Sequence, residues 1–298
     1  MKVGIIGLGK MGNAIAYRLS KGCHEVIGFD LNEENKKKIE KFGAKIAKNL
    51  EELSEKVNII WLMVPAGKPV DDILEKLLPI LSKGSILIDG GNSHFTDSIR
   101  RSKNCELKGI TFLDCGTSGG LQGRAIGFCL MIGGNKNEFE KLKPIFEVIA
   151  TSNGHSYIGP SGSGHYIKMI HNGIEYALLE SYSEGFNLLK HGFYKNLDLE
   201  KISNLWLHGS IIRSWILELT NNIFKTDQNL NNILGPIGGG QTGTWTIQEA
   251  QKQNISVPLI EESLEIREKS EITDGNYATK LVAALRHEFG GHQIKKIN

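Results

Sequence analysis

The sequence predicts an α/β protein in which a Rossmann-like, doubly wound, mostly parallel sheet is followed by an all-helical C-terminal domain. Up to residue 150, short apolar segments alternate with charged, helix-like segments, and from residue 163 the chain is a series of long amphipathic segments. The expected domains are residues 1–162 and residues 163–298. With 298 residues and 40% hydrophobic content, the chain is long enough to bury a core in each domain.

The N-terminal part begins with an apolar segment at residues 2–7, a helix-like segment at 13–19 and a second apolar segment at 26–29. Further strands are expected at residues 57–64, 85–89, 110–114 and 128–132, and helices at 69–81, 94–105 and 136–150. The C-terminal part predicts helices at residues 164–190, 199–220, 244–253, 257–269 and 276–289. A glycine-rich loop at residues 235–243 interrupts these helices, because glycine and proline disfavour helix interiors.

The first turn has the pattern G-x-G-x-x-G, written out as Gly7-Leu8-Gly9-Lys10-Met11-Gly12. It lies between a predicted strand and a predicted helix, and Asp30 ends the next strand 18 residues after Gly12. In a dinucleotide-binding turn, Gly7 permits the tight bend, Gly9 lets a pyrophosphate approach the backbone and Gly12 lets the helix pack closely. The alternative is a glycine-rich turn in another kind of α/β protein.

The acid at the end of the second strand indicates which coenzyme is bound. The carboxylate of Asp30 can accept hydrogen bonds from ribose hydroxyls and would repel a 2′-phosphate, so NAD is favoured over NADP. Leu31, Asn32 and Glu33 follow, and none of them can receive that phosphate. The lysines at 36–38 keep NADP possible, although a solvated helix face is the simpler interpretation.

Small, glycine-rich turns follow three of the predicted strands. They are Val64-Pro65-Ala66-Gly67, Asp89-Gly90-Gly91-Asn92-Ser93 and Cys115-Gly116-Thr117-Ser118-Gly119-Gly120. Ligands of doubly wound sheets bind beyond the carboxyl ends of the strands, so these turns are expected to line a coenzyme cleft. Each turn alone could be ordinary turn chemistry.

The start of the C-terminal part carries the most reactive set of side chains. Read as a helix, residues 164–176 place Lys168, His171, Asn172 and Glu175 on one face. An amine, an imidazole, an amide and a carboxyl on one face either form a solvated stripe or enclose a polar ligand. The G-x-G-x-x-G turn at residues 7–12 favours the second interpretation, in which these side chains enclose a polar ligand.

Composition excludes several other classes. The net charge is +2 and no strongly basic tract occurs, so a nucleic-acid partner is not expected. No apolar segment is long enough to span a bilayer and no leader pattern opens the chain, so the expected location is the cytoplasm. The cysteines lack C-x-x-C spacing and are expected to be reduced, with no metal: Cys23, Cys105, Cys115 and Cys129.

The residue 168–176 segment, together with the turns at 91–93 and 118–120, resembles the decarboxylating 6-phosphogluconate dehydrogenases. The similarity covers nearly the whole chain and includes residues 63–67, 127–134, 245–250 and 284–292. At this length the chain is similar to the short form of the family, which lacks the second helical half of the longer enzymes. The resemblance implies oxidation of 6-phospho-D-gluconate at C3 and loss of C1 as carbon dioxide. Ribulose 5-phosphate is the implied product, without a metal, in the pentose phosphate pathway and gluconate utilisation.

The side chains on the predicted helix suit that chemistry. The C3 hydroxyl must lose a proton, and a desolvated lysine can be neutral near pH 7, so Lys168 is the expected base. Protonated Lys168, assisted by Asn172 and His171, can then polarise the keto oxygen. The enediol that remains after decarboxylation must be protonated at the carbon that becomes C1 of the product, and Glu175 is the expected acid.

The resemblance also implies substrate contacts. Asn92, Ser118, Gly119 and Gly120 match positions that hold the sugar acid, with Asn92 also beside the nicotinamide. The phosphate positions are matched by Tyr176, Arg267, Arg286 and His292. Guanidinium groups bind phosphate dianions well, although both arginines could be ordinary surface residues. The C-terminal tail completes a neighbour's site in this family, so Arg286 and His292 are expected to act across an interface of a homo-oligomer.

The chain departs from the family pattern at two places. Long forms carry a lysine in the loop where this chain has Gly240-Gln241-Thr242-Gly243-Thr244, so the phosphate contact there must be weaker or come from backbone groups. NADP-using members carry a basic residue after the second strand, where this chain has Asp30-Leu31-Asn32. The second departure agrees with the expected preference for NAD.

Two other functions compete with this interpretation. A related 3-hydroxyacid dehydrogenase would share the glycine turn and the spacing of Lys168 and Asn172, but it would not need a proton donor for a decarboxylated product. Glu175 and the expected phosphate ligands therefore argue against it. A catalytically silent NAD-binding regulatory protein is the alternative from a different class, and the presence of every matched chemical group argues against that one.

Overall fold

The structure is a computed structural model that describes residues 1–296. It divides into two compact units, the N-terminal unit Met1–Met169 and the C-terminal unit Ile170–Asn298. Helix α8 (Ser163–His191) begins in the first unit and continues into the second. No helix in the described part of the chain combines the length and apolarity that a bilayer-spanning segment needs.

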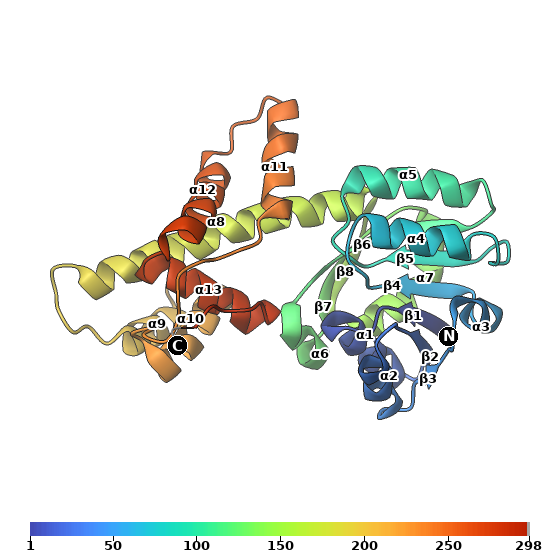
Figure 1. Cartoon of the computed structure of the whole chain (residues 1–298), viewed down its shortest axis with the longest axis horizontal. Coiled ribbons are helices and arrows are strands. Elements are labelled where there is room, and N and C mark those ends of the chain that lie inside the picture. The colour runs from blue at the N-terminus through green and yellow to red at the C-terminus, as the bar shows by residue number, and fades with distance from the viewer. Residues whose placement is uncertain (297–298) are drawn as a thin grey trace. The chain divides into compact units, whose positions relative to one another are not determined.

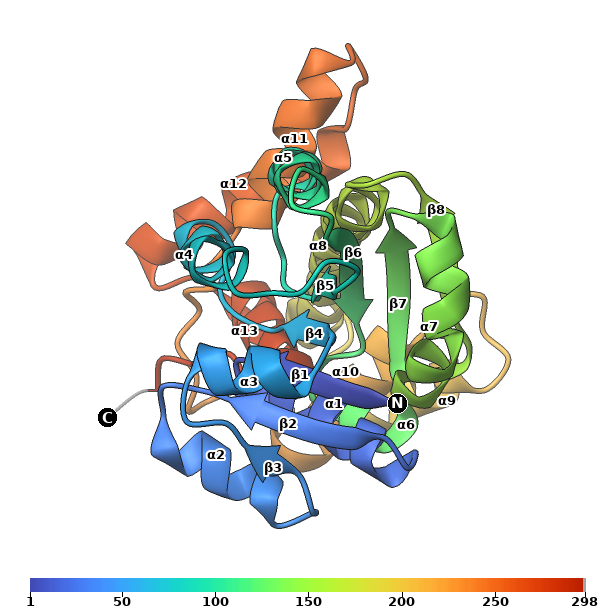
Figure 2. The ribbon, with the colours of Figure 1, turned by 90° about the vertical axis from the view of Figure 1, so that its right-hand side faces the viewer.

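The N-terminal unit contains one eight-stranded sheet with the order β3-β2-β1-β4-β5-β6-β7-β8. Neighbouring strands are parallel except for the antiparallel pair β6 and β7. The strands are β1 (Lys2–Ile6), β2 (Glu25–Phe29), β3 (Lys45–Ile46), β4 (Ile59–Leu62), β5 (Ile86–Asp89), β6 (Thr111–Ser118), β7 (Phe128–Gly133) and β8 (Ala150–Gly159). The strand order reverses at β1, between β2 and β4, and this confirms the predicted doubly wound sheet (Figure 2).

Helices cover both faces of this sheet (Figure 1). One face packs on α1 (Lys10–Lys21), α2 (Glu33–Glu40) and α7 (Lys136–Ile149). The other packs on α3 (Leu50–Lys56), α4 (Lys68–Leu77) and α5 (Phe95–Glu106). The short turns η1 (Gly120–Gln122) and α6 (Gly123–Ile126) follow β6. Asn32, Asn49 and Asn135 start α2, α3 and α7 by accepting hydrogen bonds from backbone amides of the first turn.

The C-terminal unit is helical, as predicted. Besides the rest of α8 it contains α9 (Leu199–Leu207), α10 (Trp215–Asp227), α11 (Gln241–Lys252), α12 (Pro258–Thr273) and α13 (Tyr277–Gly290). Its core is built mainly from α8, α10 and α13, and includes Leu179, Phe186, Leu217, Leu281 and Leu285, each no more than 1% exposed.

Several details differ from the sequence prediction. The single helix expected at residues 199–220 is two helices, because Gly209 has a φ of +87° and Ser214 caps the start of α10. The short elements β3, α3 and α6 were not predicted, and neither was strand β8. It is an edge strand with mostly partly or fully exposed residues, so its sequence lacks the apolar alternation that identifies a strand.

Candidate active site

The turn between β1 and α1 leaves its backbone open to a ligand. Gly7 has a φ of +89°, and a Cβ atom there would collide with the carbonyl oxygen of Met63. A Cβ atom on Gly12 would collide with the carbonyl oxygen of Gly7. At Gly9, by contrast, a Cβ atom would meet no described atom within 4 Å. The open space at the N-terminus of α1 suits a pyrophosphate, and the two crowded positions explain why only glycine fits there.

The carboxylate of Asp30 lies directly beside this turn. Its Oδ2 atom accepts a hydrogen bond of 2.6 Å from the amide of Leu8, and its Oδ1 atom accepts one of 2.7 Å from the amide of Asn32. These bonds hold the acid at the end of β2, where a ribose would meet it. The Nζ atom of Lys36 pairs with Glu33 at 2.7 Å and lies 5.9 Å from the ring centroid of Phe29, so this side chain, 13% exposed, is largely covered rather than part of a solvated helix face.

A buried arginine that the sequence did not reveal supports the turn that carries Asn92. The guanidinium of Arg101 donates to the Oγ atom of Ser93 at 2.9 Å, to the carboxylate of Asp89 at 3.4 Å and to the carbonyl of Gly67 at 3.0 Å. Its side chain is 1% exposed. The network ties together the turns that follow β4 and β5, and leaves Asn92 exposed at their surface. Asp89 at a strand end was the available signal, since a buried acid requires a partner.

Asp114, in the middle of β6, fixes the start of α8. The two carboxylate oxygens of Asp114 accept hydrogen bonds from the amides of Gly162 at 2.6 Å and His165 at 2.9 Å. The Nδ1 atom of His165 lies 2.7 Å from the Oγ atom of Ser98 on α5. Asp114 is fully buried, so it acts as a rigid link between strand and helix.

Lys168 is buried against the same strand. It is 7% exposed, and a Cβ atom built on Gly116 would lie 2.5 Å from the Cβ atom of Lys168. Two residues further along β6 is Ser118, followed by Gly119 and Gly120 with φ values of +128° and +54°. The missing side chain at Gly116 therefore lets the helix carry Lys168 close to the strand that ends in the predicted Ser-Gly-Gly turn.

In the C-terminal unit, the next turns of α8 carry the other predicted polar residues. The Nδ1 atom of His171 is 3.1 Å from the amide oxygen of Asn172 and 3.9 Å from the carboxylate of Glu175. The amide nitrogen of Asn172 donates to the hydroxyl of Thr242 at 3.3 Å, and the hydroxyl of Tyr176 is 3.0 Å from the same oxygen. Thr242 was left out of the predicted site, although the glycine-rich loop around it was a signal.

Arg267 is buried and Arg286 is half-buried, and the two guanidinium groups are close enough for their charges to interact. Arg267 is 1% exposed, its guanidinium carbon lies 3.5 Å from the ring centroid of Tyr176, and its three guanidinium nitrogens have no hydrogen-bond partner. Arg286 donates to the carbonyl of Ile237. Burial lowers the pKa of both guanidinium groups, and the charge of Arg267 lowers the pKa of Arg286 further. The buried guanidinium of Arg267, with unused donors and a second cation beside it, is an arrangement that a phosphate dianion would neutralise, and the carboxylates of Glu175 and Glu180 offset part of its charge.

A buried acid on α8 was also missed. Glu180 is 4% exposed, and neither of its carboxylate oxygens has a hydrogen-bond partner. Burial raises its pKa to about 7, although the charge of Arg267 opposes this shift. Sequence reasoning could not find it, because a glutamate on an amphipathic helix is usually exposed.

His292 is the last of the predicted site residues. It follows α13 and is exposed, and its ring lies edge-on to that of Phe289, with centroids 6.3 Å apart. In the described residues, no group of three or more His, Cys, Asp or Glu side chains is placed to hold a metal ion.

Comparison with known proteins identifies the family. Residues 2–159 match the NAD binding domain of 6-phosphogluconate dehydrogenase, and residues 164–298 match the C-terminal domain of the same enzyme. The chain is 44% identical over 301 residues to the NAD(+)-dependent, decarboxylating 6-phosphogluconate dehydrogenase of Haloferax volcanii, with 99% of each chain covered. It is 36% identical to an NAD(+)-dependent enzyme of that name from Bacillus subtilis, of whose length it covers 64%.

Solved structures give the same result. The chain superposes on Plasmodium falciparum 6-phosphogluconate dehydrogenase with a TM-score of 0.83 and 33% identity, covering 92% of this chain and 63% of that one. A 3-hydroxyisobutyrate dehydrogenase from Mycobacterium tuberculosis has a TM-score of 0.76 at 18% identity, which is a likeness of fold alone. The chain therefore belongs to the 6-phosphogluconate dehydrogenase family, and its N-terminal part to the NAD-binding domain of that family.

Proposed function

We propose that this chain oxidises 6-phospho-D-gluconate at C3 with NAD and decarboxylates the product to D-ribulose 5-phosphate and carbon dioxide. The observation that carries the proposal is the buried, unpartnered guanidinium of Arg267 beside Arg286 and Tyr176. A substrate without a phosphate would leave these donors unsatisfied in the interior, at a cost of about 1–3 kcal/mol for each unpaired group. The same feature argues against an unphosphorylated 3-hydroxyacid as substrate.

The N-terminal unit is proposed to hold the coenzyme. Its expected contacts are Gly7, Leu8, Gly9, Lys10, Met11, Gly12, Asp30, Val64, Pro65, Ala66 and Asn92. The open space at Gly9 and the carboxylate of Asp30 beside the glycine turn support a dinucleotide there. Bound NAD supplies the hydride acceptor for C3. A preference for NAD over NADP follows from the charge of Asp30.

Lys168 is proposed to act twice. It removes the proton from the C3 hydroxyl, a step that requires the neutral amine, and its side chain is buried at 7% exposure. The protonated amine then donates a hydrogen bond to the C3 keto oxygen, so electrons from the breaking C1 carboxyl bond can move onto that oxygen. Asn172 and His171 assist by holding the substrate oxygens.

Glu175 is proposed to protonate the enediol carbon that was C2 of the substrate and becomes C1 of ribulose 5-phosphate. It is on the same helix, one turn after His171, and His171 lies 3.9 Å from its carboxylate. Asn92, Ser118, Gly119 and Gly120 are proposed to bind the sugar-acid end, and Tyr176, Arg267, Arg286 and His292 the phosphate.

A shared site in a homo-oligomer stays a prediction. Within a single chain, the charge of Arg267 lowers the pKa of Arg286, so the two guanidinium groups are near each other. The alternative is therefore that each chain supplies its own phosphate site. Mixing inactive Lys168→Met chains with inactive Arg286→Ala chains separates these arrangements. Activity returns after verified subunit exchange only if Arg286 serves a neighbouring site.

Initial rates with 6-phosphogluconate and each nicotinamide coenzyme test the proposed reaction. We expect one NADH, one carbon dioxide and one ribulose 5-phosphate per turnover, with NAD preferred. The control substrate is 3-hydroxyisobutyrate, which has a primary alcohol on C3 and a carboxylate but no phosphate. Turnover of this control without turnover of 6-phosphogluconate would reject the proposal.

A further inference from the structure

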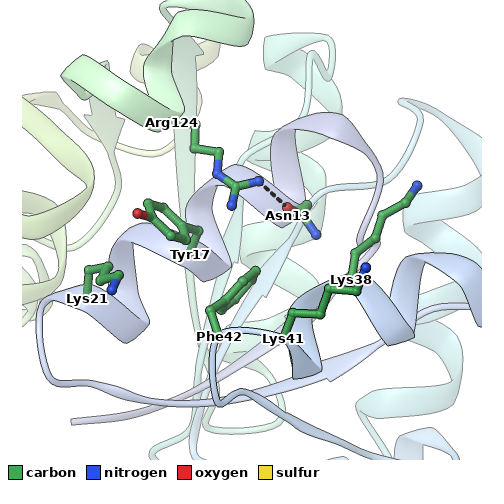
Figure 3. Close-up of a pocket in the computed structure, with 7 residues that line it drawn as sticks. All are labelled: Asn13, Tyr17, Lys21, Lys38, Lys41, Phe42 and Arg124. Atoms are coloured by element: carbon green, nitrogen blue, oxygen red, sulfur yellow. Dashed lines mark hydrogen bonds between the residues drawn. The ribbon is translucent and has the colours of Figure 1, made fainter.

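A cavity of about 430 Å³ lies on the N-terminal unit, and its lining includes none of the residues proposed to bind coenzyme and substrate, although Asn13 directly follows Gly12 (Figure 3). Its lining comes from α1, from the end of α2 and the turn after it, and from α6. Four of the lining side chains are cationic: Lys21, Lys38, Lys41 and Arg124. The lining contains no acidic side chain, so the cavity concentrates positive charge in a protein whose net charge is only +2.

One of these cations is held in place by the protein. The guanidinium carbon of Arg124 lies 4.2 Å from the ring centroid of Tyr17 and 5.8 Å from that of Phe42. Its Nη1 atom donates to the Oδ1 atom of Asn13 at 3.2 Å, as the dashed line in Figure 3 shows. The stacking and the hydrogen bond fix the group before any ligand arrives, which lowers the entropic cost of binding an anion.

A second observation points to a missing acceptor. Asn13 is 8% exposed, and its amide nitrogen is buried without a hydrogen-bond partner. A buried donor of this kind is rare and needs an explanation. We infer that an anionic oxygen bound beside Arg124 becomes this acceptor when the amide of Asn13 turns toward the cavity.

We propose that this cavity binds a small polyanion, a molecule with at least two anionic groups such as phosphates or carboxylates. A volume of about 430 Å³ is within the range of small-ligand sites. Arg124 already lies over the rings of Tyr17 and Phe42, so recognition depends on charge rather than on stacking of a nucleobase. The separate lining makes this a different site from both the coenzyme turn and the phosphate position at Arg267.

Calorimetric titration of the full chain tests the proposal. Pyrophosphate probes the phosphate class and citrate the carboxylate class, with NADH present in excess to fill the coenzyme site. The pocket variant is Lys21→Ala with Lys41→Ala, two exposed lysines. The matched control is Lys83→Ala with Lys108→Ala, which removes the same charge from exposed positions of the same unit outside the cavity. Melting temperatures of both variants verify that they fold.

We expect at least one probe to bind the unmodified chain and the control variant equally, and the pocket variant about tenfold more weakly or not at all. A tenfold loss of affinity corresponds to about 1.4 kcal/mol of binding free energy. This is less than the contribution of two charge-assisted hydrogen bonds. Which probe binds identifies the anionic group. Equal binding to all three proteins, or no binding of either probe to the unmodified chain, would overturn the proposal.

Discussion

Lys168 is the side chain whose loss is expected to stop the reaction without unfolding the protein. Lys168→Met keeps an apolar stem of similar length against Gly116 but removes both the proposed base and the later acid. General acid–base groups contribute about 10²- to 10⁴-fold, so kcat should fall by at least about 10²-fold while NAD binding stays within a few-fold. Steady-state rates and calorimetric NAD titration measure the two effects. Near-normal turnover would remove Lys168 from the mechanism.

The role of Glu175 can be distinguished from that of Lys168 because Glu175 is proposed to act only in the final protonation. Glu175→Gln keeps the size and polarity of the side chain, so 6-phosphogluconate should bind with KM changed only a few-fold. An amide cannot protonate the carbon that becomes C1 of the product, and kcat should fall by about 10²-fold or more. Glu184→Gln, an exposed position on the same helix, is the matched control and should have the parent rate. Release of ribulose 5-phosphate at the parent rate by Glu175→Gln would show that another group is the acid.

Asp30 should determine coenzyme choice through charge. Its carboxylate can form hydrogen bonds with the ribose worth about 1.5–3 kcal/mol each and repels a 2′-phosphate. Changing Asp30 to Ser and Leu31, which is 91% exposed, to Arg removes the repulsion and adds a phosphate partner. The ratio of kcat/KM for NAD over NADP should fall about tenfold for each 1.4 kcal/mol exchanged. If the unmodified chain prefers NADP, the assignment of Asp30 as the selector is wrong.

At the scale of elements, the contact between β6 and α8 controls where Lys168 lies. A Cβ atom on Gly116 would be 2.5 Å from the Cβ atom of Lys168 and 2.8 Å from the carbonyl oxygen of Gly164. Gly116→Ala must push the helix away. A displacement of about 1 Å can cost about 10²-fold in rate, and overpacking costs about 1–3 kcal/mol of stability.

Gly185→Ala is the control for this prediction. It is on the same helix, and a Cβ atom there meets no described atom within 4 Å. Alanine should stabilise the helix by about 0.5–1 kcal/mol and leave kcat unchanged. Urea unfolding and steady-state rates measure both variants. Full activity of Gly116→Ala would mean that the β6–α8 contact does not position the base.

The elements that could be predicted from the sequence have local signals. The glycine turn, Asp30 and the polar face of α8 follow from spacing along a short segment, and the fold class follows from the alternation of apolar and charged segments. Arg101 and Thr242 could not be found in this way. Thr242 meets Tyr176 across 66 residues, and Arg101 joins turns from two strands, so only the folded chain brings these partners together. Their types are common on protein surfaces, and spacing does not distinguish them.

At the scale of the whole molecule, the two units have separate cores. The N-terminal unit has an apolar cluster on each face of its sheet, and the C-terminal unit has one among its helices. Coenzyme should stabilise the N-terminal unit by mass action, whereas the protonation of a residue buried in the helical unit acts on the stability of that unit. Glu180 is such a residue.

Glu180 should make the stability of the protein fall as the pH rises from 5 to 8. In the folded chain, burial raises its pKa from 4.5 to about 7. Between these values the folded chain holds a proton that the unfolded chain has lost, so the contribution is present below pH 4.5 and is lost as the pH rises through 7. At about 1.4 kcal/mol per pH unit, the loss amounts to about 3 kcal/mol. Glu180→Gln, which resembles the protonated acid at every pH, should remove this dependence.

Urea unfolding of the two proteins at pH 5 and pH 8 measures the difference, with Glu147→Gln at an exposed position as the control. The unmodified chain and the control should lose about 3 kcal/mol more than Glu180→Gln between the two pH values. Equal losses in all three proteins would mean that Glu180 is already ionised at pH 5 in the folded chain. Its carboxylate would then have to be stabilised by Arg267, the cation that lowers its pKa, more strongly than burial destabilises it.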